Sequence, residues 1–331
     1  MKINPRCTYC LLSRVHYQCN LATDDADLIN EVMKECISAL NDAYDPSETS
    51  THVGTAVHRR CFEVLGNHDP YKETKEINNQ TALELLPEIQ KMIYGENEKG
   101  ETYTAENSPR PIEEVFEKAV LAAVIGNYFD FGIMGIDASD DGFRQKFVSY
   151  FEKGLDINDT KEMMNLLQNV VYITDNCGEI VYDREVLKVI KRIQQVQYEN
   201  KSEIQEGSKN EKTAGSNAAP PELTLIVRGA PILTDATMKD AEEFEMSATA
   251  DKILTTGSNA IGVILKETPP ETIRAMENAT LIISKGMANY ESLSDEKSMR
   301  PIAFLLRTKC EAVADSLGVA LGESIAKLEI Q

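Results

Sequence analysis

Residues 169–179 read NVVYITDNCGE and indicate the fold class of the chain. The first half is a short, continuous run of Val, Tyr and Ile, which is typical of a strand buried on both faces of a sheet. The second half becomes polar at Asp175, Asn176 and Glu179. An apolar pattern at helical spacing follows at residues 186–196, so the stretch predicts a buried strand, a polar loop and a helix.

Short apolar runs of the same kind recur through the C-terminal part of the chain. They lie at residues 223–227, 253–255, 280–283 and 302–306. Most of them are followed by a helical pattern. Strands that alternate with helices favour a mostly parallel sheet with helices on both faces. The sequence therefore predicts an α/β fold.

The first hundred residues differ, because their apolar residues recur at helical spacing. The clearest apolar faces lie at residues 27–41 and 83–93. Residues 95–111 are polar and contain Gly and Pro, which is typical of a boundary between two units. We expect a helical N-terminal domain over residues 1–105 and an α/β domain over residues 106–331.

Residues 199–221 interrupt the alternation of strands and helices. They are poor in apolar residues and rich in Lys, Glu, Ser, Gly and Asn. Such a composition buries too little apolar surface to offset the entropy of ordering the chain. We predict a flexible surface insertion within the α/β domain.

The composition is that of a soluble globular protein, with 42% apolar and 27% charged residues among 331. The 34 Lys and Arg against 54 Asp and Glu give a formal net charge of −20, which disfavours binding to nucleic acids and anionic membranes. No apolar run approaches the roughly 18 residues that span a bilayer, and the first residues lack the apolar stretch of a signal peptide. We expect a cytoplasmic protein whose seven cysteines stay thiols.

Polar side chains follow two of the predicted strands at the ends where a parallel sheet binds its ligands. Asp175 and Asn176 follow the first strand, and Asp235 follows the second. Carboxylate and amide oxygens suit a divalent ion such as Mg²⁺ or Mn²⁺. A purely structural role is the alternative, since each aspartate stands where a helix cap would stand.

Two weaker signals accompany this set. Lys285 ends an apolar run and precedes Gly286, so a phosphate could meet an ammonium group and accessible backbone N–H groups, although such a lysine is often only solvated. Asn127 and Asp130 follow a helix that begins at Pro111, where a glycine stop explains only part of the pattern.

Other motifs that are typical of metal, nucleotide or catalytic sites are incomplete or missing in this sequence. Cys7 and Cys10 have the spacing of a zinc half-site, but a second pair at comparable spacing is missing. A glycine-rich dinucleotide loop, a phosphate-binding loop of the G-x-x-x-x-G-K-[ST] type and a His-based triad are also missing.

Six segments of the chain form a recognisable series: Cys7-x-x-Cys10, Asp69-Pro70-Tyr71-Lys72 with Lys75 and Asn78, Gly126-Asn127 with Asp130-Phe131-Gly132, Asp175-Asn176-x-Gly178-Glu179, Arg228-Gly229-Ala230-Pro231 with Asp235-Ala236-Thr237, and Ser284-Lys285-Gly286 with Asn289-Tyr290-Glu291. Together they resemble the damage-control phosphatases, a family long described as domain of unknown function 89 and related to the acidic-residue methyltransferase-1-like proteins. They occur in the family's order and cover nearly the whole chain. The Cys-x-x-Cys is similar to that of the stand-alone prokaryotic branch.

The resemblance implies a Rossmann-like α/β/α domain preceded by helices, and a metal-dependent phosphatase of small phosphorylated metabolites such as sugar phosphates or nucleotides. It implies that Asp175, Asn176 and Asp235 bind the metal, for which Mg²⁺, Mn²⁺, Co²⁺ and Ni²⁺ are all candidates. Lys285 would bind phosphate. The implied substrate-binding residues are Asn127, Asp130, Arg228, Lys285, Gly286 and Asn289.

A metal held by two carboxylates and an amide can bind a phosphoryl oxygen and lower the pKa of a bound water. We therefore expect water to be the nucleophile, with Asp175 as the covalent alternative. Glu179 could orient that water or support the ligands.

Two other classes of function stay open. One is an S-adenosylmethionine-dependent carboxyl methyltransferase, which the missing glycine-rich loop disfavours. The other is a non-catalytic module that binds a metal or ligand and could use Cys7 and Cys10.

Overall fold

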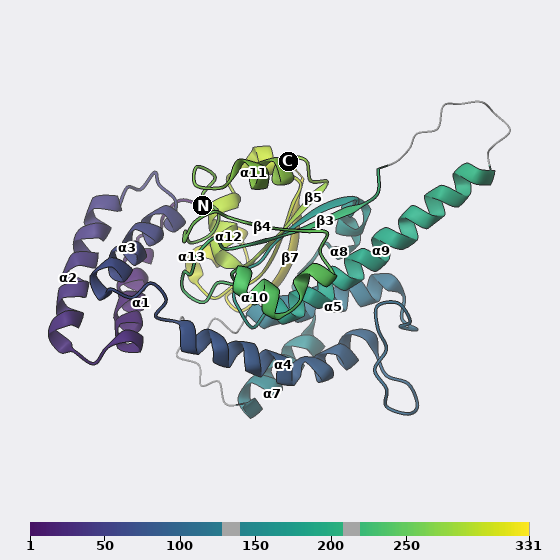
Figure 1. Ribbon diagram of the computed structural model, residues 1–331, viewed down its shortest axis with the longest axis horizontal. Coiled ribbons are helices and arrows are strands. Elements are labelled where there is room, and N and C mark those ends of the chain that lie inside the picture. The colour runs from purple at the N-terminus through teal and green to yellow at the C-terminus, as the bar shows by residue number, and fades with distance from the viewer. Residues whose placement is uncertain (128–139, 208–218, 331) are drawn as a thin grey trace.

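The computed structural model describes residues 1–127, 140–207 and 219–330, and Figure 1 shows their arrangement. A mostly parallel sheet lies at the centre, helices cover both of its faces, and three N-terminal helices stand to one side. The strands are β1 (Ile157–Asn158), β2 (Asn169–Ile173), β3 (Glu222–Val227), β4 (Lys252–Thr255), β5 (Leu281–Lys285), β6 (Ile302–Arg307) and β7 (Ser324–Glu329). The predicted α/β fold is confirmed.

The strand order places a switch of direction in the middle of the sheet. Neighbouring strands follow the order β1-β7-β6-β5-β2-β3-β4, and every pair is parallel except β6 with β7. The chain therefore runs outward from β2 to β4 on one side and returns to build β5 and β6 on the other. Ligands bind such sheets beyond the carboxyl ends of the strands at the switch point, here between β2 and β5.

Helices form a layer on each face of the sheet (Figure 1). Alternate side chains of one strand point to opposite layers, so Val170 and Tyr172 of β2 join one core while Val171 and Ile173 join the other. The first layer holds α4 (Lys72–Tyr94), α5 (Ile112–Gly126), α7 (Asp140–Lys153), α8 (Thr160–Met163), α9 (Ile180–Gly207) and α10 (Met238–Glu243). The second holds α11 (Pro270–Glu277), α12 (Gly286–Leu293) and α13 (Glu311–Leu317). Short 3₁₀ turns lie at Met164–Leu166, Met246–Ala248 and Lys297–Met299.

The first three helices form a helical lobe with a core of its own. They are α1 (Cys7–Ala22), α2 (Ala26–Ala43) and α3 (Ser50–Leu65). The carboxylate of Asp25 caps α2 by accepting from the N–H groups of Asp27 and Leu28, and Gly66 ends α3 with a φ of 62°. The predicted apolar face at residues 27–41 lies within α2.

Helix α4 packs differently from the helical lobe. Its buried Leu85, Ile89 and Ile93 belong to the same core as α5 and α9. Helix α4 therefore packs with the core of the sheet, although it precedes the expected unit boundary near residue 105. That boundary stays a prediction.

The flexible insertion over residues 199–221 stays a prediction, and its first residues are helical. Helix α9 continues without interruption to Gly207. The reason is local: residues 199–206 include Glu, Lys and Gln, which are good helix formers, and Gln195 donates to the Glu199 carboxylate one turn away, at 2.8 Å. Residues 208–218 lie outside the described residues.

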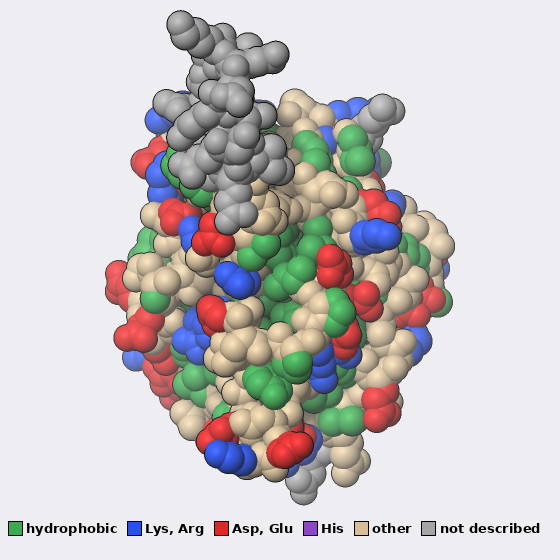
Figure 2. Space-filling model, turned by 90° about the vertical axis from the view of Figure 1, so that its right-hand side faces the viewer, with side chains coloured by type: hydrophobic (Ala, Val, Ile, Leu, Met, Phe, Trp, Pro, Cys, Tyr) green, Lys and Arg blue, Asp and Glu red, His purple; other side chains and the backbone are tan. Residues whose placement is uncertain are grey.

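The surface has a mixed charge pattern. Figure 2 shows one face of the molecule, on which acidic and basic side chains are interspersed around a strip of hydrophobic ones. None of the helices in the three described ranges is long and apolar enough to cross a membrane. All seven cysteines are free thiols.

Candidate active site

The loops that follow β2 and β3 bring the three predicted metal ligands together. Asn176 and Asp235 pair as an isolated antiparallel bridge, and the N–H of Ala236 donates to the carbonyl of Asp175 at 2.7 Å. The hydroxyl of Thr234 also donates to Oδ1 of Asn176 at 2.6 Å. The exposed fractions of Asp175, Asn176 and Asp235 are only 6%, 3% and 5%. The two strand-end loops therefore hold two carboxylates and an amide in one nearly buried group.

Gly286 fixes the position of Asp175 from the far side of the switch point. It begins α12 directly after β5 with a φ of 78°. A Cβ atom at this position would lie 1.9 Å from Oδ2 of Asp175. Only glycine fits, because any side chain would displace the carboxylate.

Asn127 connects the end of α5 to the site. Its Nδ2 donates to Oδ2 of Asp175 at 2.9 Å and to the two carboxylate oxygens of Glu179 at 3.2 and 2.9 Å. Its Oδ1 is buried and has no hydrogen-bond partner within the described parts of the chain. The predicted substrate residue Asp130 lies outside the described residues.

Lys285 belongs to a buried group of charges beneath these ligands. Its Nζ lies 3.4 Å from Oε1 of Glu179 and 3.1 Å from Oδ1 of Asp183, and all three side chains are fully buried. Burial raises the pKa of both carboxyls, against the opposing charge of Lys285. Burial also lowers the pKa of Lys285, but the carboxylates of Asp183, Glu179 and Asp175 raise it above its ordinary value. These carboxylates therefore favour the ammonium form of Lys285.

Arg228 and Asn289 hold Asp235 in place through a buried network of polar contacts. Nε of Arg228 forms an ion pair with Oδ2 of Asp235, and its Nη2 donates to Oδ1 of Asn289 at 2.7 Å. Asn289 in turn donates to the carbonyl oxygens of Thr174 at 2.9 Å and Lys285 at 2.7 Å. This network ties the ends of β2, β3 and β5 together and keeps an opposite charge beside Asp235.

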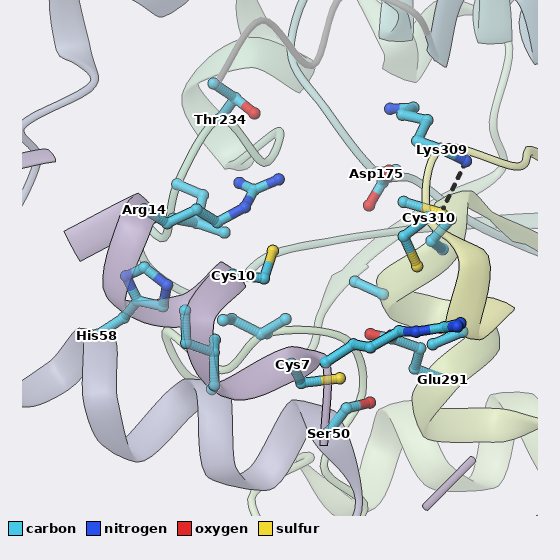
Figure 3. A pocket seen from close by; sticks show the side chains of 18 of the residues that line it. Cys7, Cys10, Arg14, Ser50, His58, Asp175, Thr234, Glu291, Lys309 and Cys310 are labelled. Carbon is cyan, nitrogen blue, oxygen red and sulfur yellow. Dashed lines mark hydrogen bonds between the residues drawn. The ribbon is translucent and has the colours of Figure 1, made fainter. Parts of the chain in front are cut away.

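A cavity of about 400 Å³ opens beside the three predicted ligands, between the strand ends and the helical lobe (Figure 3). Asp175, Asn176 and Asp235 form part of its wall. Arg14 from α1 and Lys309 from the loop after β6 also line it. The described residues that line this cavity do not include six of the predicted site residues, namely Asn127, Glu179, Arg228, Lys285, Gly286 and Asn289.

Comparisons with known proteins identify the family. A profile of the damage-control phosphatase ARMT1-like domain matches residues 3–201 and 218–325. The chain belongs to this family. Membership supports a phosphatase role and confirms the family inferred from the sequence.

Individual members of the family match the chain from end to end. A protein named damage-control phosphatase from Archaeoglobus fulgidus is 40% identical over 329 residues, which are 99% of each chain. Another of that name, from Pyrococcus horikoshii, is 28% identical over 325 residues, which are 97% of this chain and 96% of the relative. The crystal structure of a DUF89 family protein from Pyrococcus horikoshii superposes with a TM-score of 0.76 at 25% identity and covers 99% of both chains.

Two cations that line this cavity, Arg14 and Lys309, were not predicted from the sequence. Lys309 follows strand β6, so the rule applied to the other strand ends would have found it. Its charge also acts on the site, because it lowers the pKa of Glu179 against the stronger effect of burial. Arg14 had no comparable signal, since its place depends on how the helical lobe meets the sheet.

The cysteines of the Cys-x-x-Cys motif line the same cavity with Cys310 (Figure 3). Burial raises the pKa of the Cys7 thiol to about 11, which disfavours the thiolate that binds zinc. Within the described residues, no group of three or more His, Cys, Asp or Glu side chains is arranged to hold a metal ion. The strand-end group is of another kind, because it combines the carboxylates of Asp175 and Asp235 with the amide of Asn176.

The strand-end residues fit a hard divalent cation in three respects. Their donors are oxygens of Asp175, Asn176 and Asp235, which Mg²⁺ and Mn²⁺ prefer. The amide donors of Asn127 and Asn176 both reach Oδ2 of Asp175 and so fix that carboxylate. Gly286 provides the space in which it rests. A fixed set of oxygens beside an open cavity is the arrangement that a catalytic metal requires.

Proposed function

We propose that the chain is a divalent-metal-dependent phosphatase of small phosphorylated metabolites, with Asp175, Asn176 and Asp235 as the metal ligands. The observation that carries the proposal is the bridge between Asn176 and Asp235, which places two carboxylates and an amide in the wall of one cavity. Family membership supports the reaction class. The cavity volume is within the range of small-molecule sites.

A divalent ion held by these oxygens would supply positive charge to a phosphoryl oxygen and lower the pKa of a coordinated water. The protein's own cations add to that charge. Arg14 and Lys309 line the cavity beside Asp175, where they can bind phosphate oxygens and stabilise the charge that develops in transfer. In this proposal Lys285 acts on the site through its buried neighbours, because its ammonium group offsets the negative charge of the Glu179 and Asp183 carboxylates.

Water is the nucleophile that the arrangement favours. Two amide groups donate to Oδ2 of Asp175, and the carboxylate rests against Gly286, so it is fixed as a ligand would be. Glu179 accepts from the N–H of Asn176 at 3.0 Å and from Asn127, which gives it the role of holding the ligand loop.

Hydrolysis of an aryl phosphate by chelator-stripped protein tests the proposal, with each of Mg²⁺, Mn²⁺, Co²⁺ and Ni²⁺ added back. We expect metal to restore turnover in the parent and not in Asp175→Ala or Asp235→Ala. Asp315→Ala is the matched control, since this exposed aspartate pairs only with Arg6 among the contacts of the described chain. Full turnover without metal, or turnover retained in Asp175→Ala, would contradict the metal site.

A further inference from the structure

We propose that Glu291 makes the cavity selective for phosphomonoesters whose far end carries a hydroxyl or ammonium group, and that it rejects those with a second anionic group there. This inference rests on the proposed function, because it assumes that the phosphate lies at the metal ligands. It assigns a ligand-recognition role to a residue of α12 that the reaction itself does not require.

The cavity has two chemically different ends. Figure 3 shows Asp175, Arg14 and Lys309 toward one end, and Cys7, Ser50 and Glu291 toward the other. All of them line the same cavity. Arg6 also lines the cavity, and its guanidinium pairs with Glu311 and Asp315. A ligand that places its phosphate beside Asp175, Arg14 and Lys309 would therefore direct the rest of its structure toward Glu291, Ser50 and Cys7.

The helical periodicity of α12 places Glu291 in the cavity wall. Met287 and Glu291 are four residues apart, so they share one face of the helix, and both line the cavity. Asn289 and Tyr290 face the interior and are buried. Gly286 anchors the start of the helix against Asp175, so the distance along α12 separates the metal ligands from Glu291.

Charged groups of both signs act on Glu291. The positive groups that act on it are the N-terminal ammonium of Met1 and the guanidinium of Arg14, and Asp175 acts with the opposite sign. Burial is the largest effect and raises the pKa of Glu291 to about 7. The ammonium of Met1 is already engaged with the carbonyl of Glu291, Oγ of Ser294 and the carboxylate of Asp295.

A carboxylate in such a wall discriminates by what it can accept. An ionised carboxylate only accepts hydrogen bonds, so a ligand hydroxyl or ammonium group satisfies it. A ligand carboxylate or second phosphate would instead place two negative charges together in a partly apolar cavity, where the repulsion is little screened. Leu11, Ile261 and Met287 contribute the apolar part of the lining.

Binding of two matched ligands to the Mn²⁺-loaded protein tests the inference without relying on turnover. They are the phosphonate analogues of glycerol phosphate and of phosphoglycerate, which carry a hydroxymethyl group and a carboxylate at the same position. Calorimetry at about pH 8 keeps Glu291 ionised. We expect the parent to bind the hydroxymethyl analogue at least about tenfold more tightly, and Glu291→Gln to reduce this preference to about threefold or less.

Two further variants separate this role from a general effect of charge or folding. Glu311→Gln removes the same charge from the rim of the same cavity, where Glu311 pairs with Arg6 at 3.1 Å and is 62% exposed, so it should keep the parent's preference. Glu291→Asp retains the charge and should still disfavour the carboxylate analogue.

The outcomes distinguish this inference from the proposed function. A parent without preference, or a Glu291→Gln variant that keeps the full preference, would overturn the role of Glu291 even if aryl phosphate is hydrolysed. The expected preferences in all four proteins would support it even if no phosphate ester is turned over, and the failure would then belong to the proposed reaction.

Discussion

Gly286 is the residue on which the position of Asp175 depends most directly. Its φ of 78° and the 1.9 Å that would separate a Cβ atom from Asp175 Oδ2 are two independent constraints. The first concerns the stability of the backbone, and the second concerns the proposed metal ligand Asp175. A substitution at a second glycine can separate them.

We predict that Gly286→Ala weakens metal binding by at least about tenfold, because its methyl group displaces the Asp175 carboxylate. Gly318→Ala is the control, since Gly318 has a φ of 71° and open space where its Cβ would lie. The left-handed backbone costs each variant about 1–2 kcal/mol of unfolding free energy. Calorimetric titration of Mn²⁺ measures the difference, and equal metal affinity in the two variants would contradict the role of Gly286.

His58 makes the stability of the helical lobe depend on pH. It is fully buried, and its Nδ1 lies 3.0 Å from Oε1 of Gln18. Burial, with a smaller contribution from Arg14, lowers its pKa to about 3. An unfolded histidine titrates near pH 6.5. Between these values the unfolded chain binds more protons than the folded one, so stability is lost as pH falls below about 6.5.

We predict that the parent loses about 2 kcal/mol of unfolding free energy relative to His58→Gln between pH 7 and pH 5. Urea unfolding at both pH values measures this difference. His16→Gln replaces an exposed histidine of α1 and should follow the parent. Parallel pH profiles for the parent and His58→Gln would show that folding does not lower the pKa of His58.

Helix α4 joins the loop after β2, which carries two of the proposed metal ligands, to helix α10. Oδ1 of Asn79 accepts from the N–H of Gly178 at 2.7 Å, and its Nδ2 donates to Oδ1 of Asp240 at 3.1 Å. Asp240 also completes the capping box of α10 by accepting from Thr237. One amide of α4 therefore joins the loop after β2 to the helix that follows β3.

We predict that Asn79→Ala costs about 1–3 kcal/mol of unfolding free energy, since it leaves a buried N–H and a buried carboxylate without this partner. It should also weaken Mn²⁺ binding several-fold, because the loop after β2 and helix α10 lose the same support. Gln80→Ala is the control, as Gln80 is exposed on the same helix and donates to Glu84. Reduced stability with unchanged metal affinity would limit Asn79 to a structural role.

The elements that the sequence predicted are those whose signal is local. β2 and β3 are buried on both faces and appear as continuous apolar runs, so their positions were predicted to within a residue or two. β7 was missed because its outer half is only partly buried and contains Lys327 and Glu329. It is also antiparallel to β6, so it lacks the alternation with helices on which the prediction relied.

The same distinction between local and non-local signals applies to the residues of the candidate site. Asp175 and Asp235 were found because each follows a buried strand, and the structure brings them to one cavity. Lys309 obeys the same rule. Arg14 and Glu291 face that cavity only through the packing of α1 and α12 against the strand ends, which no local pattern encodes. The roles of all these residues stay predictions.

The molecule as a whole forms its cavity from two parts, the helical lobe and the ends of the sheet. The lobe contributes Arg14, and the sheet contributes the proposed metal ligands. Arg59 of α3 joins the two parts: its guanidinium donates to both carboxylate oxygens of Glu267 at 2.9 and 2.6 Å and to Oδ1 of Asn259 at 2.9 Å. Arg59 lowers the pKa of Glu267 to about 2, so this pair persists through the neutral range.

Because the lobe forms one wall of the cavity but carries none of the proposed metal ligands, loosening it should affect substrate binding more than chemistry. We predict that Arg59→Lys, which cannot make the two parallel hydrogen bonds, raises KM for aryl phosphate several-fold and changes kcat by less than about twofold. Arg60→Lys is the control, since Arg60 pairs with Glu35 and Glu63 inside the lobe. The amide hydrogens of α3 and of the segment around Glu267 should exchange faster in Arg59→Lys than in the parent, and they should not do so in Arg60→Lys. A fall in kcat at constant KM would instead show that the lobe positions reacting groups.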